Sequence, residues 1–383
     1  MTGPGVSSES ACVDCLRRSW LIGALAPYIQ IVCDDRPGKR TPELLRLDDE
    51  ELAEAASGTH ADRILSEVLE IPEAQMLRSL DDAGCWACCR HDDRFPEGLG
   101  DGADAPRILI GKGAGLRLAD LGTDDSVTIV GARRATGYGL EVARTLGREL
   151  TSAGLNVISG LALGIDGAAH RGALEAGRTV AVLATGADRP YPLSHSRLYR
   201  QVLENGLIIS EVPPGTNPLR WQFPARNRIM AALSGMTVVV EAALRSGSLI
   251  TAEMASDAGR EVGAVPGQVT IAAAAGTNEL ISSGAALIRD GRDVIDRVVG
   301  VGAMPVPAGG PAIDHGQAEV IGAVEAGCST VDAAADHLGI DSGEVAIALA
   351  RLEVMGYLAC SLAGTYARTT QPLPPDTYPS GRE

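Results

Sequence analysis

The sequence is short of lysine, of aromatic side chains and of long apolar runs. Lys39 and Lys112 are the only lysines among 33 basic residues, and 12 of the 383 residues are aromatic. No apolar run approaches the roughly 20 residues of a membrane-spanning helix. The best candidate, Trp20–Cys33, is shorter and contains Pro27. The N-terminus also lacks the basic start and apolar core of a signal peptide. These absences predict a cytoplasmic protein that does not contact a membrane.

The net charge of −16 is unevenly distributed along the chain. Residues 1–125 carry −11 and residues 300–383 carry −7, whereas residues 126–299 carry 17 arginines against 15 acidic side chains. A GC-rich genome would explain why arginine replaces lysine, but it would not explain this regional difference. If the protein binds phosphates, we expect the middle segment to do so.

Eight cysteines are present, and six of them fall within the first 90 residues. In a large chain in a reducing compartment we expect free thiols. Cys12 and Cys15 form one C-x-x-C pair, Cys85 and Cys88 form another, and the two pairs together could bind zinc through four thiolates. The gap of about 70 residues is far longer than in a zinc ribbon, and neither pair lies in a compact knuckle sequence. We therefore favour thiols and predict no metal.

Strands and helices are expected to alternate through the middle of the chain. Six short apolar runs there suit strands buried on both faces of a parallel sheet: Val127–Val130, Leu155–Ile158, Val180–Leu183, Leu207–Ile209, Thr237–Val240 and Val262–Val265. Amphipathic helical patterns separate them. The alternation predicts an α/β fold with a Rossmann-like, doubly wound, mostly parallel sheet.

The segments on either side of the middle region predict two smaller domains and the connections between them. The first hundred residues have helical patterns such as Pro42–Ala55 and Ala61–Leu69, and three short helical patterns followed by a hairpin near the C-terminus predict a winged helix. The expected order is a helical N-terminal (SAM-like) domain (1–100), a connecting segment (101–125), the Rossmann-like domain (126–299), a Pro/Gly linker (300–315), the winged helix (316–370) and a disordered tail (371–383).

Ligands of open parallel sheets bind beyond the carboxyl ends of the strands, where helix N-termini present free N–H groups. The first such loop, from Gly131 to Gly139, has Arg133 where a dinucleotide fingerprint has its second glycine. A side chain there obstructs a pyrophosphate, and Ser159 ends the second strand where an acidic residue would hold a ribose. This loop therefore favours a phosphate bound by Arg133 over NAD.

Two further loops after strands are rich in glycine and hydroxyl groups. They run from Ser159 to Asp166 and from Ser246 to Thr251. One such loop alone is more often a tight turn, but three loops at one edge of a sheet favour a phosphate site. The segment Trp221–Ile229 adds arginines, an asparagine and two aromatic residues, which suit phosphates and stacked bases, although the aromatic residues could equally belong to the core.

No nucleophile with a base and an orienting group is visible. Asp166 and His170 lie one helical turn apart, but such a pair more often stabilises a helix start than catalyses a reaction. The middle segment also lacks the carboxylate cluster that binds catalytic magnesium. We therefore expect no enzyme activity and no cofactor.

Five motifs in this order resemble the DprA/Smf family of DNA-processing proteins: GARRATGYG, SGLALGIDGAAH, FPARNRIMAALS, VVVEAALRSGSLITA and AVPG. The similarity is strong from about Val127 to Val298 and weaker in the N-terminal region and the C-terminal winged helix. The resemblance implies a dimeric Rossmann-like domain that binds single-stranded DNA in a basic pocket. It also implies a partner, the recombinase RecA, which the protein would help to load in transformation (competence) or homologous recombination.

The resemblance also implies the residues of the DNA site. Arg133 matches the arginine of the family's G-S-R loop, with Ala132 in place of the serine, and Arg134 follows it. The other expected DNA-binding residues match the family's later motifs: Ser159, Gly160, Gly164, Asp166, Arg226, Asn227, Arg228, Ser246, Gly247, Ser248 and Thr251.

Two other classes of protein remain as alternatives. Phosphoribohydrolases that act on nucleotides resemble this architecture, but their P-G-G-x-G-T-x-x-E signature is absent. A transcription regulator would use the winged helix, but residues 319–368 carry seven acidic side chains against Arg351 and Arg368. Phosphates would be repelled there, so we expect this module to contact protein instead.

Overall fold

The computed structural model divides into two compact units, Met1–Pro305 and Val306–Glu383. The expected linker, 300–315, spans their boundary. The residues that the structure describes are 11–35, 41–100, 104–113, 115–301, 313–361, 364–369 and 373. Within them, no helix has the length and apolar character needed to cross a bilayer.

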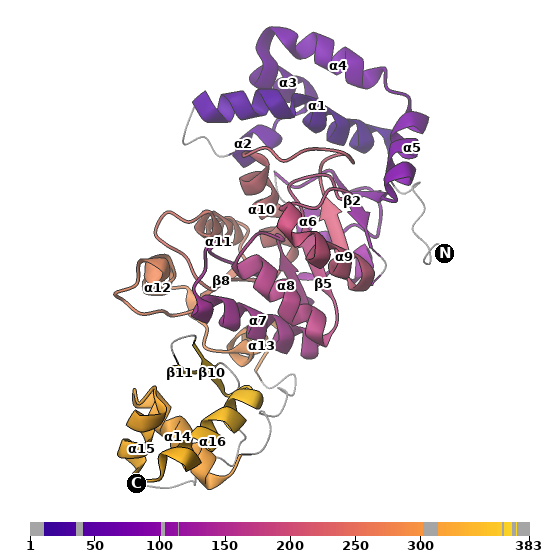
Figure 1. Ribbon diagram of the computed structural model, residues 1–383. Helices are drawn as coiled ribbons and strands as arrows, with labels where there is room; N and C mark the ends of the chain where they lie inside the picture. The colour runs from indigo at the N-terminus through magenta and orange to yellow at the C-terminus, as the bar shows by residue number, and fades with distance from the viewer. Residues whose placement is uncertain are drawn as a thin grey trace. The chain divides into compact units, whose positions relative to one another are not determined.

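A sheet of nine strands forms the centre of the first unit (Figure 1). Its order is β1-β2-β6-β5-β4-β3-β7-β8-β9. The strands from β3 onward pair in parallel, while β2 runs antiparallel to β6 and β1 runs antiparallel to β2. The bounds are β1 (Trp86–Cys89), β2 (Ile108–Lys112), β3 (Ser126–Val130), β4 (Asn156–Ser159), β5 (Thr179–Val182), β6 (Leu207–Ser210), β7 (Met236–Val239), β8 (Glu261–Ala264) and β9 (Ala286–Leu287). The predicted α/β fold with a mostly parallel sheet is confirmed.

Side chains alternate between the two faces of the sheet, and helices cover both faces. Val127 and Ile129 of β3 join one buried cluster with residues of α7, α8 and α13, whereas Val130 joins another with residues of α10 and α11. Both faces are therefore buried, which explains the continuous apolar runs in the sequence. The helices of this domain are α6 (Glu97–Gly100), α7 (Gly137–Ser152), α8 (Ile165–Ala176), α9 (Ser196–Asn205), α10 (Gln222–Leu233), α11 (Gly247–Asp257), α12 (Ala275–Ser282) and α13 (Gly291–Val298).

The strand order reverses between β3 and β7. The chain adds β4, β5 and β6 on one side of β3, then crosses over and adds β7, β8 and β9 on the other. Loops that leave neighbouring strands in opposite directions open a crevice at such a switch point. The loops that follow β3 and β7 flank this crevice.

Among the described residues, five helices precede the first strand: α1 (Val13–Asp35), α2 (Thr41–Leu45), α3 (Asp49–Ser57), α4 (Ala61–Leu69) and α5 (Glu73–Ala83). Helix α1 contacts β2 and α5 contacts β1, whereas α2 contacts α10, and α3 and α4 pack against α1. Trp221, which precedes α10, shares a buried cluster with α1, and its indole Nε1 donates a hydrogen bond to the carbonyl of Ala26 at 2.9 Å. This aromatic residue is therefore part of the core.

Two strands come from residues that we expected to be helical or connecting. Ile108–Lys112 is an apolar run like the other strands, but no helix follows it, so the strand–helix alternation does not reveal it. Along β1, Ala87 and Cys89 face the same buried cluster as Cys15 and Leu16, whereas Cys88 faces the opposite cluster. The two C-x-x-C pairs consequently do not form one four-thiolate group.

In the part of the second unit that the structure describes, three helices precede a two-stranded antiparallel sheet. They are α14 (His315–Glu325), α15 (Val331–Leu338), α16 (Ser342–Val354), β10 (Leu358–Cys360) and β11 (Tyr366–Arg368). Tyr357 and Leu349 are fully buried in its core. The helices lie where the sequence predicts them, and the assignment as a winged helix stays a prediction. The expected tail lies outside the described residues except for Leu373.

Candidate nucleic-acid interface

A cavity of about 780 Å³ opens at the carboxyl edge of the sheet, beside the switch point. The loop after β3, the start of α8, the start of α10 and the start of α11 surround it. Its lining includes three exposed arginines and two aromatic side chains, namely Arg133, Arg134, Arg220, Tyr191 and Phe223, together with Asp166, Arg226, Asn227, Ser246, Gly247, Ser248 and Thr251. Most of the residues predicted from the sequence therefore meet in one place.

A cation and two rings form a continuous surface in this cavity. The guanidinium carbon of Arg133 lies 5.0 Å from the centre of the Phe223 ring, and the Phe223 and Tyr191 ring centres lie 5.5 Å apart with their planes tilted by 48°. A guanidinium over a ring face is attracted by the ring quadrupole and keeps its N–H groups directed outward. The arrangement can hold a phosphate beside a stacked planar group.

Backbone contacts with neighbouring loops hold the Arg133 loop in place. The N–H of Ala132 donates to the carbonyl of Glu241 at 2.7 Å, and the carbonyl of Ala132 accepts from the N–H of Ile165 at 3.2 Å. Gly164 has a φ of +77°, and a Cβ at this position would lie 2.2 Å from the Ala132 oxygen. Glycine is therefore required here so that the loops after β3 and β4 can approach each other.

Arg226 forms part of the cavity floor and is almost fully buried. Its guanidinium donates to the carbonyl of Gly160 at 2.8 Å and to that of Val182. A Cβ on Gly160 would lie 2.3 Å from the guanidinium, so this close contact requires glycine. Burial lowers the pKa of Arg226 to about 10, partly offset by the charge of Asp166. The side chain joins the ends of β4 and β5 and stabilises the site from below.

Asp166 is also buried and has its partners inside the protein. Its carboxylate accepts from the N–H of Gly160 at 3.0 Å. Burial raises the pKa of Asp166, while the charge of Arg226 acts in the opposite direction. The carboxylate orders the loop after β4.

Arg228 is held by an ion pair away from the cavity. Its Nη2 atom donates to the two carboxylate oxygens of Glu211 at 2.7 and 2.6 Å, and the two side chains are only 5% and 11% exposed. Breaking a buried pair of this kind leaves an unpaired charge, which is costly. Arg228 is consequently engaged within the fold.

The hydroxyl-bearing residues divide into two groups. Ser159 is fully buried and donates to the carbonyl of Ile129 at 2.6 Å, which links β4 to β3. Ser246 caps α11, with its hydroxyl 2.7 Å from that of Ser248. Ser246, Ser248 and Thr251 line the cavity, where the N-terminus of α11 favours an anion.

His170 does not form an acid–base pair with Asp166. Its Nδ1 lies 2.9 Å from the hydroxyl oxygen of Thr179, whose own proton is donated to the carbonyl of Val157. The imidazole therefore donates through Nδ1–H. Burial lowers the pKa of His170 to about 3. This histidine is bonded within the core, and it does not make the helix-start contact with Asp166 that the sequence favoured.

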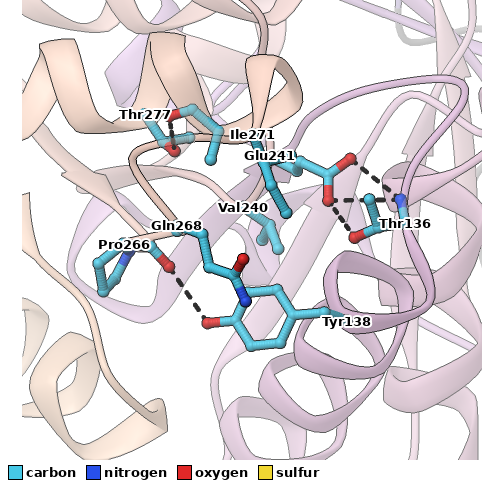
Figure 2. Close-up of a pocket in the computed structure, with 10 residues that line it drawn as sticks. Thr136, Tyr138, Val240, Glu241, Pro266, Gln268, Ile271 and Thr277 are labelled. Atoms are coloured by element: carbon cyan, nitrogen blue, oxygen red, sulfur yellow. Dashed lines mark hydrogen bonds between the residues drawn. The ribbon is translucent and has the colours of Figure 1, made fainter.

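A second cavity, of about 540 Å³, lies at the same edge (Figure 2). The carboxylate of Glu241 projects from the end of β7 to the start of α7, where it accepts hydrogen bonds from the N–H and the hydroxyl of Thr136. Thr136 is the N-cap of α7. In a dinucleotide-binding domain the pyrophosphate lies at this helix start. Here a carboxylate of the chain lies there, which agrees with the absence of a dinucleotide fingerprint.

Tyr191 and Arg220 also line the cavity, although no motif in the sequence points to them. Tyr191 comes from the segment between β5 and α9, and Arg220 lies just before Trp221. Aromatic residues are scarce in this chain, so each exposed one is a candidate for ligand binding. Tyr191 meets this criterion, and its ring packs against that of Phe223.

The fold and this cavity define a Rossmann-like α/β protein whose ligand cavity is lined by arginine and aromatic side chains in place of a dinucleotide loop. A family model described as DNA recombination-mediator protein A matches residues 86–299. The chain belongs to this family, and the DprA/Smf resemblance predicted from the sequence is confirmed.

Similar proteins support the same assignment. A relative in Mycobacterium tuberculosis is 43% identical over 242 residues, which cover 61% of this chain and 62% of the relative's length. DNA processing protein DprA of Streptococcus pneumoniae is 42% identical over 205 residues, covering 53% of this chain and 71% of that protein. The X-ray structure of DprA from Streptococcus pneumoniae aligns with a TM-score of 0.59 and 32% identity, covering 76% of this chain and 97% of that one.

Proposed function

We propose that this protein binds single-stranded DNA in the cavity lined by Arg133 and Phe223. The observation that carries the proposal is the position of the Arg133 guanidinium over the Phe223 ring, inside a cavity with two further exposed arginines. Arginine binds phosphate through two parallel hydrogen bonds, and an aromatic ring stacks on any base. The name DNA processing protein, carried by relatives such as that of Streptococcus pneumoniae, supports DNA as the ligand.

The aromatic pair favours single strands over duplex. In a duplex the base faces are stacked on each other, and only the phosphates and groove edges are accessible. Stacking on Phe223 or Tyr191 requires an unpaired base. Because every base has a π-face, the binding should depend little on sequence.

The wider role is also proposed. We infer that the protein protects incoming or processed DNA in the cytoplasm and helps to load the RecA recombinase, acting as a homodimer through the Rossmann-like domain and without cofactor or catalytic turnover. The description of the matching family as a recombination mediator and the DprA/Smf resemblance support this role.

A titration of the full chain with oligonucleotides at two salt concentrations tests the proposed ligand. The full chain is needed because β1 and β2 complete the sheet beyond β6. We expect tight binding of single strands, much weaker binding of duplex of the same length, and a loss of affinity as salt rises. Equal affinity for both forms would contradict the proposal. Release of free base from a nucleoside monophosphate above background would instead favour the phosphoribohydrolase alternative.

A further inference from the structure

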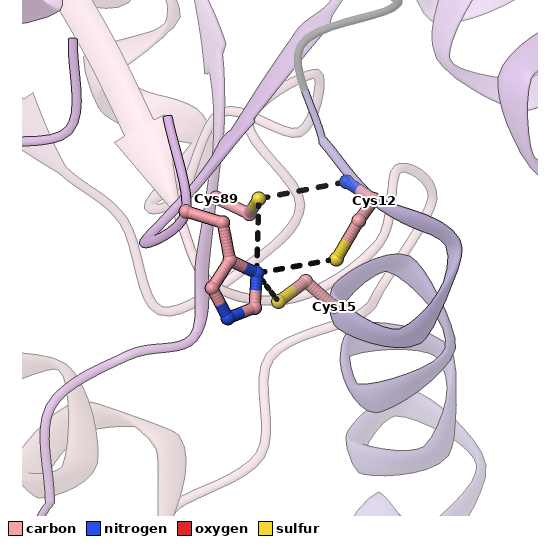
Figure 3. Close-up of side chains that lie close together, drawn as sticks. Cys12, Cys15 and Cys89 are labelled. Carbon is pink, nitrogen blue, oxygen red and sulfur yellow. Dashed lines mark hydrogen bonds between the residues drawn. The ribbon is translucent and has the colours of Figure 1, made fainter. Parts of the chain in front are cut away.

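Four potential metal ligands from distant parts of the chain meet on the surface of the first unit (Figure 3). Cys12 and Cys15 lie at the start of α1, Cys89 ends β1, and His91 follows two residues later. One donor atom from each of the four side chains lies within 4.8 Å of all the others. Cys15 and Cys89 are buried, whereas Cys12 and His91 are exposed. None of these residues lines the cavity that contains Arg133 and Phe223.

The three nitrogen–sulfur distances within this cluster match the edges of a tetrahedron around one metal ion. The Nδ1 atom of His91 lies 3.4 Å from the sulfur of Cys12, 3.7 Å from that of Cys15 and 3.8 Å from that of Cys89. Zinc bonds thiolate sulfur at about 2.3 Å and histidine nitrogen at about 2.0–2.1 Å, which separates tetrahedral sulfur and nitrogen ligands by about 3.6 Å.

Hydrogen bonding alone does not account for the cluster. A neutral imidazole Nδ1 has one lone pair or one proton, and thiols are weak donors. Three sulfur atoms around one nitrogen exceed that capacity. If the lone pair of Nδ1 points to a central cation, all three sulfurs and the nitrogen share one partner.

Local structure explains why these cysteines, and not the second C-x-x-C pair, come together. Cys12 and Cys15 are separated by one helical turn, so their side chains lie on the same side of the start of α1. Strand alternation turns Cys89 toward α1 and Cys88 to the opposite face. The neighbouring carboxylate of Asp92 is bound to Arg94 by hydrogen bonds of 2.8 and 2.7 Å.

We propose that Cys12, Cys15, Cys89 and His91 bind one structural zinc ion. Three thiolates and one imidazole are a common ligand set of closed, four-coordinate zinc sites, and soft sulfur ligands disfavour magnesium and calcium. A two-iron cluster needs two pairs of ligands separated by the width of the cluster, and here all four donors converge on one point. The four ligands leave no position for substrate, so the site is structural.

The zinc ion connects two parts of the chain. Cys12 and Cys15 precede the residues matched by the family model, whereas Cys89 and His91 lie within them. Binding fixes the start of α1 against the end of β1 and closes a loop of more than 70 residues. Such a crosslink should stabilise the packing of the N-terminal helices on the sheet.

The metal content of the full-length protein tests this proposal. The chain is purified without a metal-binding tag under reducing conditions and analysed by elemental mass spectrometry. We expect close to one zinc per chain, and strong thiolate-to-metal charge-transfer absorption after replacement of zinc by cobalt. A reduced, folded chain that holds no zinc after incubation with zinc and dialysis would overturn the proposal. A disulfide between Cys12 and Cys15 that persists in the presence of the reducing agent would also overturn it.

Three variants, with Cys360→Ser as the control, test the assignment of the ligands. Cys12→Ser changes an exposed residue and should reduce zinc content several-fold, whereas Cys360→Ser, an exposed cysteine of the second unit, should leave it unchanged. His91→Cys should retain zinc because it preserves four ligands, while His91→Ala should lose it. A chelator should lower the melting temperature of the parent protein and leave that of Cys12→Ser nearly unchanged. Equal zinc content in Cys12→Ser and the parent would contradict the assignment.

Discussion

The guanidinium of Arg133 lies 5.0 Å from the centre of the Phe223 ring, although Arg133 comes from the loop after β3 and Phe223 from the first turn of α10. The ring supports the cation from one side and leaves its hydrogen-bond donors facing the cavity. This pair gives the site two separable functions, because the guanidinium can bind phosphate and the ring can stack on a base. The first two predictions separate them.

Arg133→Ala should weaken binding of single-stranded DNA by about 1–3 kcal/mol, because a charge-assisted contact to phosphate is lost. The slope of log affinity against log salt should become shallower by about 0.7, since one fewer counterion is released. Arg133→Lys should restore only part of the affinity, because lysine cannot bind phosphate through two parallel N–H groups. The matched control is Arg144→Ala, whose guanidinium pairs with Glu175 on the surface. Unchanged binding by a folded Arg133→Ala protein at both salt concentrations would show that the site is elsewhere.

Phe223→Leu should weaken binding by about 1–3 kcal/mol through the loss of base stacking. Its salt slope should stay that of the parent, because no charge is removed. Tyr138→Leu is the control, since Tyr138 is an exposed aromatic residue of the second cavity. A larger effect of Tyr138→Leu than of Phe223→Leu would assign the bases to the second cavity.

Arg226→Leu should lower the free energy of unfolding and leave the affinity of the folded protein for single-stranded DNA nearly unchanged. Its loss leaves the buried carbonyls of Gly160 and Val182 without this donor, at a cost of about 1–3 kcal/mol each. Denaturant unfolding followed by circular dichroism measures this effect. If Arg226→Leu keeps the stability of the parent but loses affinity and salt slope, the guanidinium contacts phosphate directly.

His170 should make the protein sensitive to mild acid. Its pKa is about 3 in the folded state against an ordinary value of 6.5, so below pH 6.5 the unfolded chain takes up a proton that the folded chain does not. The free energy of unfolding should therefore fall as the pH drops below 6.5 on account of this group, with a slope that approaches about 1.4 kcal/mol per pH unit only well below the unfolded-state pKa. His170→Asn should flatten this dependence, and the exposed His315→Asn should not. Parallel curves for the parent and His170→Asn between pH 6.5 and 5 would exclude this role.

Removal of the whole second unit, Val306–Glu383, should leave affinity for single-stranded DNA nearly unchanged. The removed segment carries ten acidic side chains against three basic ones, so it offers few cations to phosphates. Because it is a separate compact unit, its removal should not disturb the sheet. A tenfold loss of affinity on deletion would indicate that this unit contacts DNA.

The sequence predicted strands β3 to β8 well, because strands buried on both faces have a strong apolar signal. It also predicted that the loops after these strands meet at one edge, because parallel strands end there, and the binding of DNA at that edge stays a proposal. It did not distinguish arginines that face the cavity from arginines that support it. Arg226 and Arg228 lie in the same motif as Asn227, but their partners come from β4, β5 and the segment after β6. Only the folded chain shows which arginine already has an acceptor.

The cysteine cluster illustrates the same limit. The spacing of two C-x-x-C pairs pointed to Cys85 and Cys88, but the cluster contains Cys89 and His91 instead. The spacing of residues within a segment can be read from the sequence, whereas the face of β1 that meets α1 depends on packing between distant elements. A search for paired C-x-x-C motifs therefore finds Cys12 and Cys15 correctly but adds Cys85 and Cys88 in place of Cys89 and His91.

The position of the Glu241 carboxylate affects how free nucleotides can bind at the start of α7. Its carboxylate is covalently attached to the domain and lies against the start of α7, so its effective concentration there far exceeds that of any free anion. A free mononucleotide at millimolar concentration would have to displace this tethered anion before its phosphate could occupy the helix start. We therefore expect the Glu241 carboxylate to weaken the binding of free nucleotides at the start of α7. The neighbouring arginine-lined cavity would stay available to single-stranded DNA even where small nucleotides are abundant.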